Sequence, residues 1–472
     1  MNYISTRGAA PPVSFIQMLL AGLAPDGGLY LPQAYPRLSQ NAIAGFAGRS
    51  YEEVANAILT PFVADEIEAG ALRDMIEAAY ADFRHKAIAP LAQLDSNLFV
   101  LELFHGPTLA FKDLAMQLLA KLIGHVLNVR GERATIIGAT SGDTGAAAVD
   151  AFRGLPEVDV FILYPHGRVS EVQRRQMTTA GAGNVHTIAL EGTFDDAQAC
   201  VKNMFNHKTL RDELNLCGVN SINLARILFQ TVYYFTGAVA LGGPYRKISF
   251  VVPTGNFGDI LAGWMAKRMG LPIDRLVIAT NSNDILTRTL ACGDYFVQTV
   301  HPTQSPSMDI QLSSNFERLL FEAHGRDAGA LCRSMAGLRQ SQGFTIEPGP
   351  LHAIRAEFEA FSVTEVETTR EIAQSWRETG FLADPHTAVG LNAARKAKAL
   401  ASESPLVVLG TAHCAKFPAT IGYATGMRPD LPGHLAGLFE RKEKFSILPN
   451  DQSEIERFIH ARAARAANQA AR

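Results

Sequence analysis

The residue with the clearest chemical potential in this sequence is a lysine at the start of an apolar helical stretch. Lys112 follows a His-Gly-Pro turn in the segment HGPTLAFKDLAMQLL. Apolar residues recur with helical spacing from Phe111 to Ile123, so Lys112 is expected in the first turn, at the edge of the buried face. A buried amine tends to lose its proton, and it can then condense with an aldehyde. The alternative is a lysine that reaches water and pairs with Asp113 or Glu102.

A second candidate is the turn GATSGDTGAAA, residues Gly138 to Ala148, between an expected strand and an expected helix. Its backbone N–H groups and hydroxyls would lie at the positive end of the helix, where a carboxylate or a phosphate can bind. The glycine spacing does not match the dinucleotide fingerprint, and the chain has no P-loop lysine motif for a nucleotide triphosphate. Taken alone, this segment could equally be an ordinary strand-to-helix turn.

Two further turns follow buried strands. In PTGNFGD, Gly255 and Gly258 allow the backbone to approach a ligand closely, and Asn256 and its neighbouring amides can donate to a phosphate. In LGTAHCAKFP, Thr411 offers a hydroxyl at a strand end, where ligands gather in open α/β sheets, although a local cap is the alternative. No histidine pair has metal-ligand spacing with acidic partners, so no metal site is predicted.

The elements that must position these residues alternate between strand and helix. Buried strands are expected at NLFVLELF, ATIIGAT, VDVFILYP, VHTIALEG, KISFVVP, RLVIATNS and PLVVLGTA, with helical segments between them. Thr193 and Asp196 provide the N-terminal cap of one such helix. This alternation predicts an α/β fold with parallel sheets wrapped by helices.

The chain is also expected to divide into regions. Residues 50 to 86 have a helical pattern and little before residue 90 resembles a strand, so residues 1–92 are predicted to form a mainly helical N-terminal lobe. Residues 93–472 are long enough for a core of two α/β lobes. The irregular region Gly293 to Leu312, rich in Ser, Thr and Pro, is expected to be a surface loop or a connection between lobes.

Composition narrows the class of partner. The 472 residues include 43 basic and 46 acidic side chains, which gives no electrostatic footprint for nucleic acid or an anionic membrane. The five cysteines are scattered without a CxxC pair, which suits a reducing compartment. The start lacks a signal-peptide pattern, and no run of about 20 apolar residues could span a bilayer. We therefore expect a cytoplasmic protein with small-molecule partners, and neither nucleic-acid nor membrane binding.

Read in order, the segments resemble the threonine synthases, a family of pyridoxal-phosphate enzymes related to tryptophan synthase β subunits and to serine and threonine dehydratases. The resemblance is carried by YISTRG and PDGGLYLP near the start, then HGPTLAFKD, GATSGDTGAAA, PTGNFGD and TAHCAKFP. It covers nearly the whole chain. It implies a two-lobed fold type II pyridoxal-phosphate enzyme with an additional N-terminal lobe.

The resemblance also implies roles for individual residues. Lys112 would carry pyridoxal 5'-phosphate as a Schiff base and act as the catalytic base, and Thr411 would face the pyridine nitrogen. The cofactor phosphate would be held by Gly255, Asn256, Phe257 and Gly258. The substrate carboxylate would be received on the loop formed by Thr140, Ser141, Gly142, Asp143 and Thr144. Relatives such as the O-acetylserine sulfhydrylases have asparagine at the position of Asp143.

The implied reaction converts O-phospho-L-homoserine and water into L-threonine and phosphate, in a monomer or a homodimer. A serine or threonine dehydratase would use the same lysine and phosphate loop but expel a β-hydroxyl, and the ISTRG and DGGLYLP segments favour the synthase. A catalytically silent relative that binds small phosphorylated ligands is a third reading. The presence of Lys112 speaks against it.

Overall fold

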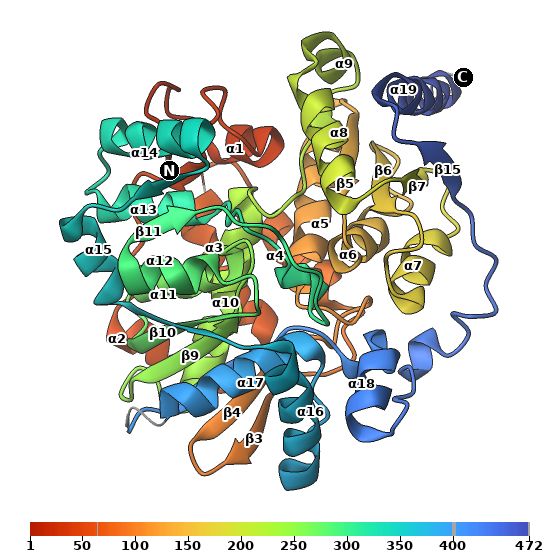
Figure 1. Cartoon of the computed structure of the whole chain (residues 1–472). Helices are drawn as coiled ribbons and strands as arrows, with labels where there is room; N and C mark the ends of the chain where they lie inside the picture. The colour runs from red at the N-terminus through yellow and green to blue at the C-terminus, as the bar shows by residue number, and fades with distance from the viewer. Residues whose placement is uncertain (64, 399–402, 471–472) are drawn as a thin grey trace.

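The chain is organised around two separate sheets, each covered by helices (Figure 1). The computed structural model describes residues 1–63, 65–398 and 403–470. The larger sheet has the strand order β13 (Phe358–Ser362), β10 (Ile273–Thr280), β9 (Ile248–Pro253), β14 (Leu406–Gly410), β4 (Leu98–Glu102) and β3 (Leu91–Asp95). The smaller has the order β15 (Ser446–Pro449), β7 (Val185–Glu191), β6 (Val158–Pro165), β5 (Ala134–Ala139) and β8 (Leu216–Cys217).

Both sheets are parallel throughout, except where β3 runs antiparallel to β4 at one edge. Parallel strands with both faces covered are apolar on both sides, and all eight residues of β6 are buried. The structure confirms the predicted α/β fold of two lobes with parallel sheets wrapped by helices. Each of the seven predicted buried strands is found within a few residues of its expected bounds.

Helices surround both sheets. Those that pack on the larger sheet are α11 (Gly258–Arg268), α12 (Ile285–Cys292), α15 (Pro348–Arg355) and α17 (Pro385–Lys398). Those that pack on the smaller sheet are α6 (Asp143–Phe152), α8 (Phe194–Asn206), α9 (Lys208–Glu213) and α19 (Gln452–Ala470). The others are α5 (Lys112–Arg130), α7 (Glu171–Thr178), α10 (Leu224–Ala240), α13 (Phe316–Ala323), α14 (Ala328–Ser341), α16 (Glu365–Thr379) and α18 (Pro418–Thr425), with 3₁₀ turns η1 (Pro306–Met308), η2 (Cys414–Lys416) and η3 (Gly433–Leu435).

Helix α5 lies at the centre of the molecule, in contact with α6, with α10 and with a helix of the N-terminal region. The predicted apolar stripe described one face of it, but the helix is buried on nearly all sides as far as Leu127. A helix buried all round belongs to the interior of a large protein. Lys112, its first residue, therefore lies inside the protein rather than at a boundary with water.

The N-terminal region is mainly helical, with α1 (Phe15–Ala21), α2 (Gln40–Ala44), α3 (Tyr51–Val63) and α4 (Ala69–Tyr80). Two short antiparallel strands, β1 (Tyr3–Ser5) and β2 (Tyr30–Pro32), were not anticipated, because three residues are too few for a periodic pattern. Apolar residues of α3 and α4 belong to the same buried cluster as those of α5 and α10. The division of the chain at residue 92 stays a prediction.

The region Gly293 to Leu312 is only partly the surface loop that the sequence predicts: residues 298 to 302 are irregular and exposed, but the rest is more ordered. It contains β11 (Asp294–Phe296), which pairs with β12 (Gly343–Thr345), and the 3₁₀ turn η1. Ser305, Met308 and Gln311 are buried. Its many small polar residues suggested exposure, whereas they bond to one another and to the buried Asn281.

The local cap predicted for α8 is confirmed, since Thr193 and Asp196 form a reciprocal capping box. Among the helices of the described residues, none combines the length and apolar character that a membrane span requires.

Candidate active site

Lys112 is held by a backbone junction between the start of α5 and the end of β14. The N–H of Phe111 donates to the carbonyl of Thr411 over 2.9 Å, and the N–H of His413 donates to the carbonyl of Leu109 over 3.1 Å. The Lys112 Nζ lies 4.5 Å from the centre of the Phe111 ring, and the residue is 8% exposed. The junction fixes the position of Lys112 relative to Thr411.

The partner of Lys112 is Asp143, whose Oδ2 lies 3.5 Å from the Lys112 Nζ. The two partners considered from the sequence are engaged elsewhere, and that alternative is wrong. Asp113 accepts hydrogen bonds from the N–H and the hydroxyl of Thr108, and Glu102 pairs with a histidine at 2.7 Å. Lys112 therefore belongs to a polar cluster inside the protein and does not extend to solvent.

Asp143 also binds two residues that the sequence did not single out, Lys416 and Gln173. The Lys416 Nζ lies 2.8 Å from Asp143 Oδ1, and Gln173 Nε2 donates to the same oxygen over 2.9 Å. Lys416 is 0% exposed and also donates to the carbonyl of Thr108 over 2.6 Å. These contacts link three distant segments of the chain, so no sequence periodicity reveals them. The only signal was a lysine after a buried strand in TAHCAKFP.

The charges in this cluster favour a reactive amine. Burial lowers the pKa of Lys112, the carboxylate of Asp143 partly offsets this, and the positive charges of Lys416 and Arg226 lower it further. Burial alone would raise the pKa of Asp143, but the Lys416 and Lys112 ammonium groups hold it well below its usual range. Asp143 is therefore ionised, while Lys112 loses its proton more readily than an exposed lysine.

Arg226, in the first turn of α10, is a further buried cation that the sequence did not indicate. It is 3% exposed, donates from Nη1 to the carbonyl of Val219 over 3.0 Å, and has a buried Nε without a partner among the described residues. Burial lowers its pKa to about 10. An arginine in this state adds positive charge to the site.

The turn at Thr140 to Thr144 forms an open cradle of backbone amides. The Thr140 hydroxyl accepts hydrogen bonds from the N–H groups of Gly142 and Gly145, at 2.9 and 2.8 Å. Within the described ranges, no acceptor is found for the N–H groups of Ser141, Asp143 and Thr144. Gly142 has a φ of 141°, and a Cβ there would lie 2.4 Å from Gln173. This turn can receive an anion such as a carboxylate.

The turn at Gly255 to Gly258 forms a second cradle. Two of its carbonyls are occupied by side chains: Ser313 donates to the Gly255 carbonyl over 2.7 Å, and Asn315 donates to the Asn256 carbonyl over 2.8 Å. Phe257 has a left-handed φ of 64°, which helps to turn successive amides to one side. The N–H groups from Gly255 to Gly258 find no acceptor in the part of the chain that the structure describes. Converging free amides at the start of α11 suit a phosphate.

Thr411 lies at the end of β14 with its backbone fixed and its hydroxyl available. Its N–H donates to the Thr387 hydroxyl over 3.2 Å, and Thr387 and His386 are in turn held by the buried Asp384. The Thr411 hydroxyl forms no hydrogen bond with any described residue, so it does not act as a local cap. The cap at this position is His413, whose Nδ1 accepts from the N–H of Ala415 over 3.1 Å.

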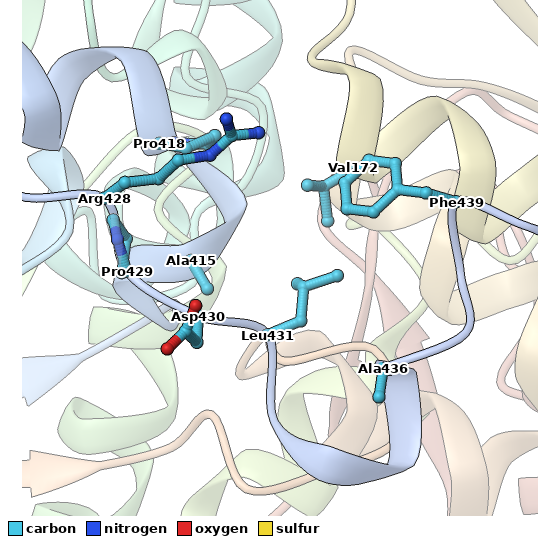
Figure 2. A pocket seen from close by; sticks show the side chains of 9 residues that line it. All are labelled: Val172, Ala415, Pro418, Arg428, Pro429, Asp430, Leu431, Ala436 and Phe439. Atoms are coloured by element: carbon cyan, nitrogen blue, oxygen red, sulfur yellow. The ribbon is translucent and has the colours of Figure 1, made fainter.

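A cavity of about 410 Å³ lies beside the cluster (Figure 2). Its wall includes Val172 and Ala415, which precede Gln173 and Lys416 in the chain, and the segment from Arg428 to Phe439 that leads from α18 toward β15. In Figure 2, Val172 and Phe439 line one side of this space, and Pro418 and Arg428 line the other. Among the described residues, no group of three or more His, Cys, Asp and Glu side chains could hold a metal ion.

Comparison with known proteins identifies the class and then the family. Residues 84–348 match the family model of pyridoxal-phosphate-dependent enzymes, and residues 2–80 and 387–459 match the models of the threonine synthase N terminus and C-terminal region. The chain is 50% identical to a threonine synthase from Pseudomonas aeruginosa over 97% of its own length and 98% of the relative's.

Solved structures agree. A structure of pyridoxal-phosphate-bound threonine synthase from Brucella melitensis matches with a TM-score of 0.95 at 57% identity, covering 98% of this chain and 99% of the other. Threonine synthase from yeast matches with a TM-score of 0.92 at 37% identity, with the same coverage. The chain belongs to the threonine synthase family. It is a pyridoxal-phosphate-dependent lyase that acts on a small amino-acid phosphate, and the dehydratase and silent alternatives are not favoured.

The residues present fit this cofactor. A buried amine with a lowered pKa suits its aldehyde. Four amides and the Thr411 hydroxyl, none of which has a hydrogen-bond partner among the described residues, suit its phosphate and a neutral ring nitrogen.

Proposed function

We propose that the chain converts O-phospho-L-homoserine and water into L-threonine and inorganic phosphate, with Lys112 as the residue that carries the cofactor and moves the protons. The observation that supports this most directly is a buried amine in contact with the first of two turns whose amides have no acceptor among the described residues. Lys112 Nζ lies 3.5 Å from Asp143 in one turn. Its charge also acts on Asp259, directly after the other turn.

Each cradle has a proposed ligand. Gly255, Asn256, Phe257 and Gly258 would hold the cofactor phosphate, because their amides have no acceptor among the described residues and lie at the start of a helix. The substrate carboxylate would bind the amides of the loop from Thr140 to Thr144. The Thr411 hydroxyl would accept or donate at the ring nitrogen without imposing a charge on it.

The cofactor, when bound, withdraws electrons from the carbon skeleton of the amino acid, which makes protons at the α- and β-carbons removable. Lys112 is the group that we expect to remove these protons. The phosphate then leaves the γ-carbon and a proton is added there; water next adds at the β-carbon, and a proton finally returns to the α-carbon. One flexible amine can reach three neighbouring carbons, whereas Asp143 is held by three partners and is kept ionised.

The proposal is tested with the purified protein, the cofactor and each candidate substrate in separate reactions. We expect inorganic phosphate and threonine in equal amounts from O-phospho-L-homoserine, and little ammonia from threonine or serine. Ammonia release from threonine at a comparable kcat/KM would instead favour a dehydratase.

Attachment of the cofactor is a separate question. After reduction with borohydride, mass spectrometry of the digested protein should find a single pyridoxyl group, on the peptide that contains Lys112. A label on a different peptide would overturn the role of Lys112 even if the reaction itself were found. No label and no turnover would favour the silent relative.

We also propose that residues 1–92 form an N-terminal lobe on a catalytic core of residues 93–472, and that the chain acts in the cytoplasm as a monomer or a homodimer. The helices α1 to α4 support the lobe, and the five cysteines scattered without a CxxC pair support a reducing compartment. Light scattering of the purified protein measures the number of subunits.

A further inference from the structure

Lys416 is a fully buried lysine that the proposed reaction does not yet use. Its ammonium group makes two contacts, to Asp143 Oδ1 at 2.8 Å and to the Thr108 carbonyl at 2.6 Å. The residue ends η2, the 3₁₀ turn that follows β14, and its backbone N–H donates to the carbonyl of His413 over 3.1 Å. A cation enclosed in this way is retained only if an anion compensates for its lost hydration.

The two oxygens of Asp143 have different surroundings. Oδ1 receives both Lys416 and Gln173, at 2.8 and 2.9 Å. Oδ2 faces Lys112 at 3.5 Å, a longer contact. Lys416 is thus the closer cation, and Asp143 would keep an ionic partner if the amine of Lys112 became neutral. Without Lys416, a neutral Lys112 would leave a buried carboxylate without a counterion, which is strongly unfavourable.

We propose that Lys416 is a positioning residue for the reaction: it is the permanent counterion of Asp143, so that Lys112 can lose its proton without leaving the carboxylate unpaired. This inference rests on the proposed role of Lys112. In this arrangement, Lys416 is the ionic partner of Asp143, and Lys112 is the amine that reacts.

Other charged groups also face Lys112 and Asp143, but none contacts Asp143 as Lys416 does. On α10, Arg226 adds repulsion that favours a neutral Lys112. On α11, Asp259 is held by two tyrosine hydroxyls, at 2.5 and 3.0 Å, and burial raises its pKa to about 6. On α17, His386 accepts from the Ser307 N–H at Nε2, so its Nδ1 carries the proton toward Asp384.

On α5, Asp113 lies near Lys416, and it is bonded to the N–H and hydroxyl of Thr108. Burial raises the pKa of Asp113 to about 7. Its hydrogen bonds are to neutral groups, so it does not replace Asp143 as the ionic partner of Lys416.

The test is a double-mutant cycle on the full-length protein without cofactor, and the quantity measured is the pH at which Lys112 deprotonates. The variants are Lys416→Met, Asp143→Asn and the double variant. In each, the fraction of Lys112 modified by a pulse of acetic anhydride is measured by mass spectrometry across a pH series, which gives the pH at which the amine deprotonates. Lys396→Met, which removes a lysine paired with Glu367 at 2.9 Å near the surface, is the matched control.

We expect the Lys112 midpoint to rise by about 1 to 3 pH units in Lys416→Met, because the carboxylate then pairs with Lys112 alone. It should fall in Asp143→Asn, and adding Lys416→Met to that variant should raise it by less than Lys416→Met does alone, because the carboxylate is then absent. The control should leave it unchanged. After cofactor is restored, the pH profile of kcat in Lys416→Met should shift in the alkaline direction.

The decisive comparison is between the unaltered protein and Lys416→Met; if that variant does not fold, Lys416→Gln, which can still donate to the Thr108 carbonyl, replaces it. A midpoint that stays unchanged when Lys416 loses its charge would show that Lys416 does not influence Lys112, and a shift as large in the Asp143→Asn background would show that it acts without Asp143; either result would make the inference wrong. Because this labelling needs neither substrate nor turnover, it can fail while the proposed reaction stands, and the reverse also holds.

Discussion

At the scale of residues, the reactivity of Lys112 depends on two conditions. Its amine is buried, and little negative charge lies near it to stabilise the protonated form. Among the residues that the structure describes, Lys112 has a single anionic contact, at 3.5 Å, and that anion is shared with a closer lysine. A tightly paired lysine would keep its proton and could act neither as a nucleophile nor as a base. The geometry of the second lysine is therefore as relevant to the chemistry as that of the first.

Replacement of Lys112 by alanine should separate folding from catalysis. Asp143 keeps Lys416 and Gln173 as partners, so we expect Lys112→Ala to fold with a melting temperature close to that of the unaltered protein. It should bind cofactor without a covalent bond and lose turnover by about 10³-fold or more, because a general base contributes about 10² to 10⁴. Phosphate release and absorbance spectra measure both effects.

Lys121→Ala, on the same helix, is the control and should retain activity. Turnover in Lys112→Ala within a factor of ten of the original would show that another group moves the protons.

The sequence identified Lys112 but not its surroundings. Its position after a turn and within an apolar stretch was readable, because helical spacing is local. Asp143 was found by its turn, whereas Lys416 and Gln173 were missed, because contacts between residues 273 or 30 positions apart leave no periodic trace. Asp113 and Glu102 are wrong as partners of Lys112 for the same reason. They are close to Lys112 in the sequence, but the fold pairs Lys112 with the distant Asp143.

At the scale of elements, the two cradles are strand-to-helix turns of a parallel α/β fold, and the sequence predicts both turns. It does not predict the loop around Ser305 to Met308, which packs against the second cradle. Its small polar residues suggested a surface loop, but Ser305 and Met308 are buried and Ser307 lies against Gly255. Composition reports polarity, and polarity is compatible with burial when the side chains bond to one another.

A methyl group at Gly255 should loosen the second cradle. A Cβ there would lie 2.9 Å from the Ser307 carbonyl oxygen. Because this neighbour is a backbone atom, it cannot move aside as a flexible side chain could. We expect Gly255→Ala to raise the Kd for pyridoxal 5'-phosphate by about 10-fold or more, through displaced amides, with a smaller loss of stability. Titration followed by absorbance measures the Kd. Gly349→Ala, where a Cβ meets nothing within 4 Å, should change neither quantity; equal affinities in the two variants would refute a close-packed cradle.

The turn that carries Lys416 should be sensitive to acid. Burial, with a contribution from His105, lowers the pKa of His413 to about 4, and its Nδ1 accepts the Ala415 N–H only when unprotonated. The unfolded chain takes up this proton below about pH 6.5 and the folded chain does so only near 4. His413 therefore lowers the free energy of unfolding as the pH falls from 6.5 to 4, by on the order of 2 kcal/mol.

Urea denaturation at pH 7 and at pH 4.5 measures this loss. In His413→Asn, whose amide oxygen can still accept the Ala415 N–H, the loss between the two pH values should be smaller than in the unaltered protein. The exposed His352→Asn is the control. If both variants lose as much stability as the original, His413 does not contribute to acid sensitivity.

At the scale of the whole molecule, the N-terminal region and the catalytic core share one buried cluster, which the sequence could not reveal. The helical pattern before residue 86 was readable, and so was the change to alternating strands and helices after it. A change of pattern does not indicate whether two regions fold separately, because each can be complete in secondary structure and still depend on the other for burial.

Arg318 connects the N-terminal region to the rest of the chain. Its replacement tests whether the stability of one region depends on the other. Arg318 is 0% exposed; its guanidinium donates to the carbonyls of Tyr30 in β2 and Ile222, at 2.8 and 2.7 Å, and to the side chain of Asn315. Asn315 in turn bonds to the Asn256 carbonyl in the second cradle. One side chain thus connects the N-terminal region to the cofactor-binding turn.

Arg318→Met should leave these acceptors buried without donors, and we expect the free energy of unfolding to fall by about 3 to 5 kcal/mol. The Kd for pyridoxal 5'-phosphate should rise at the same time, because Asn315 loses its anchor. Calorimetry should show one transition moved to lower temperature, and Arg333→Met, at an exposed position on α14, should leave it in place. If the N-terminal region and the core shared no dependence, the variant would instead show two transitions, with only one displaced and the cofactor affinity intact.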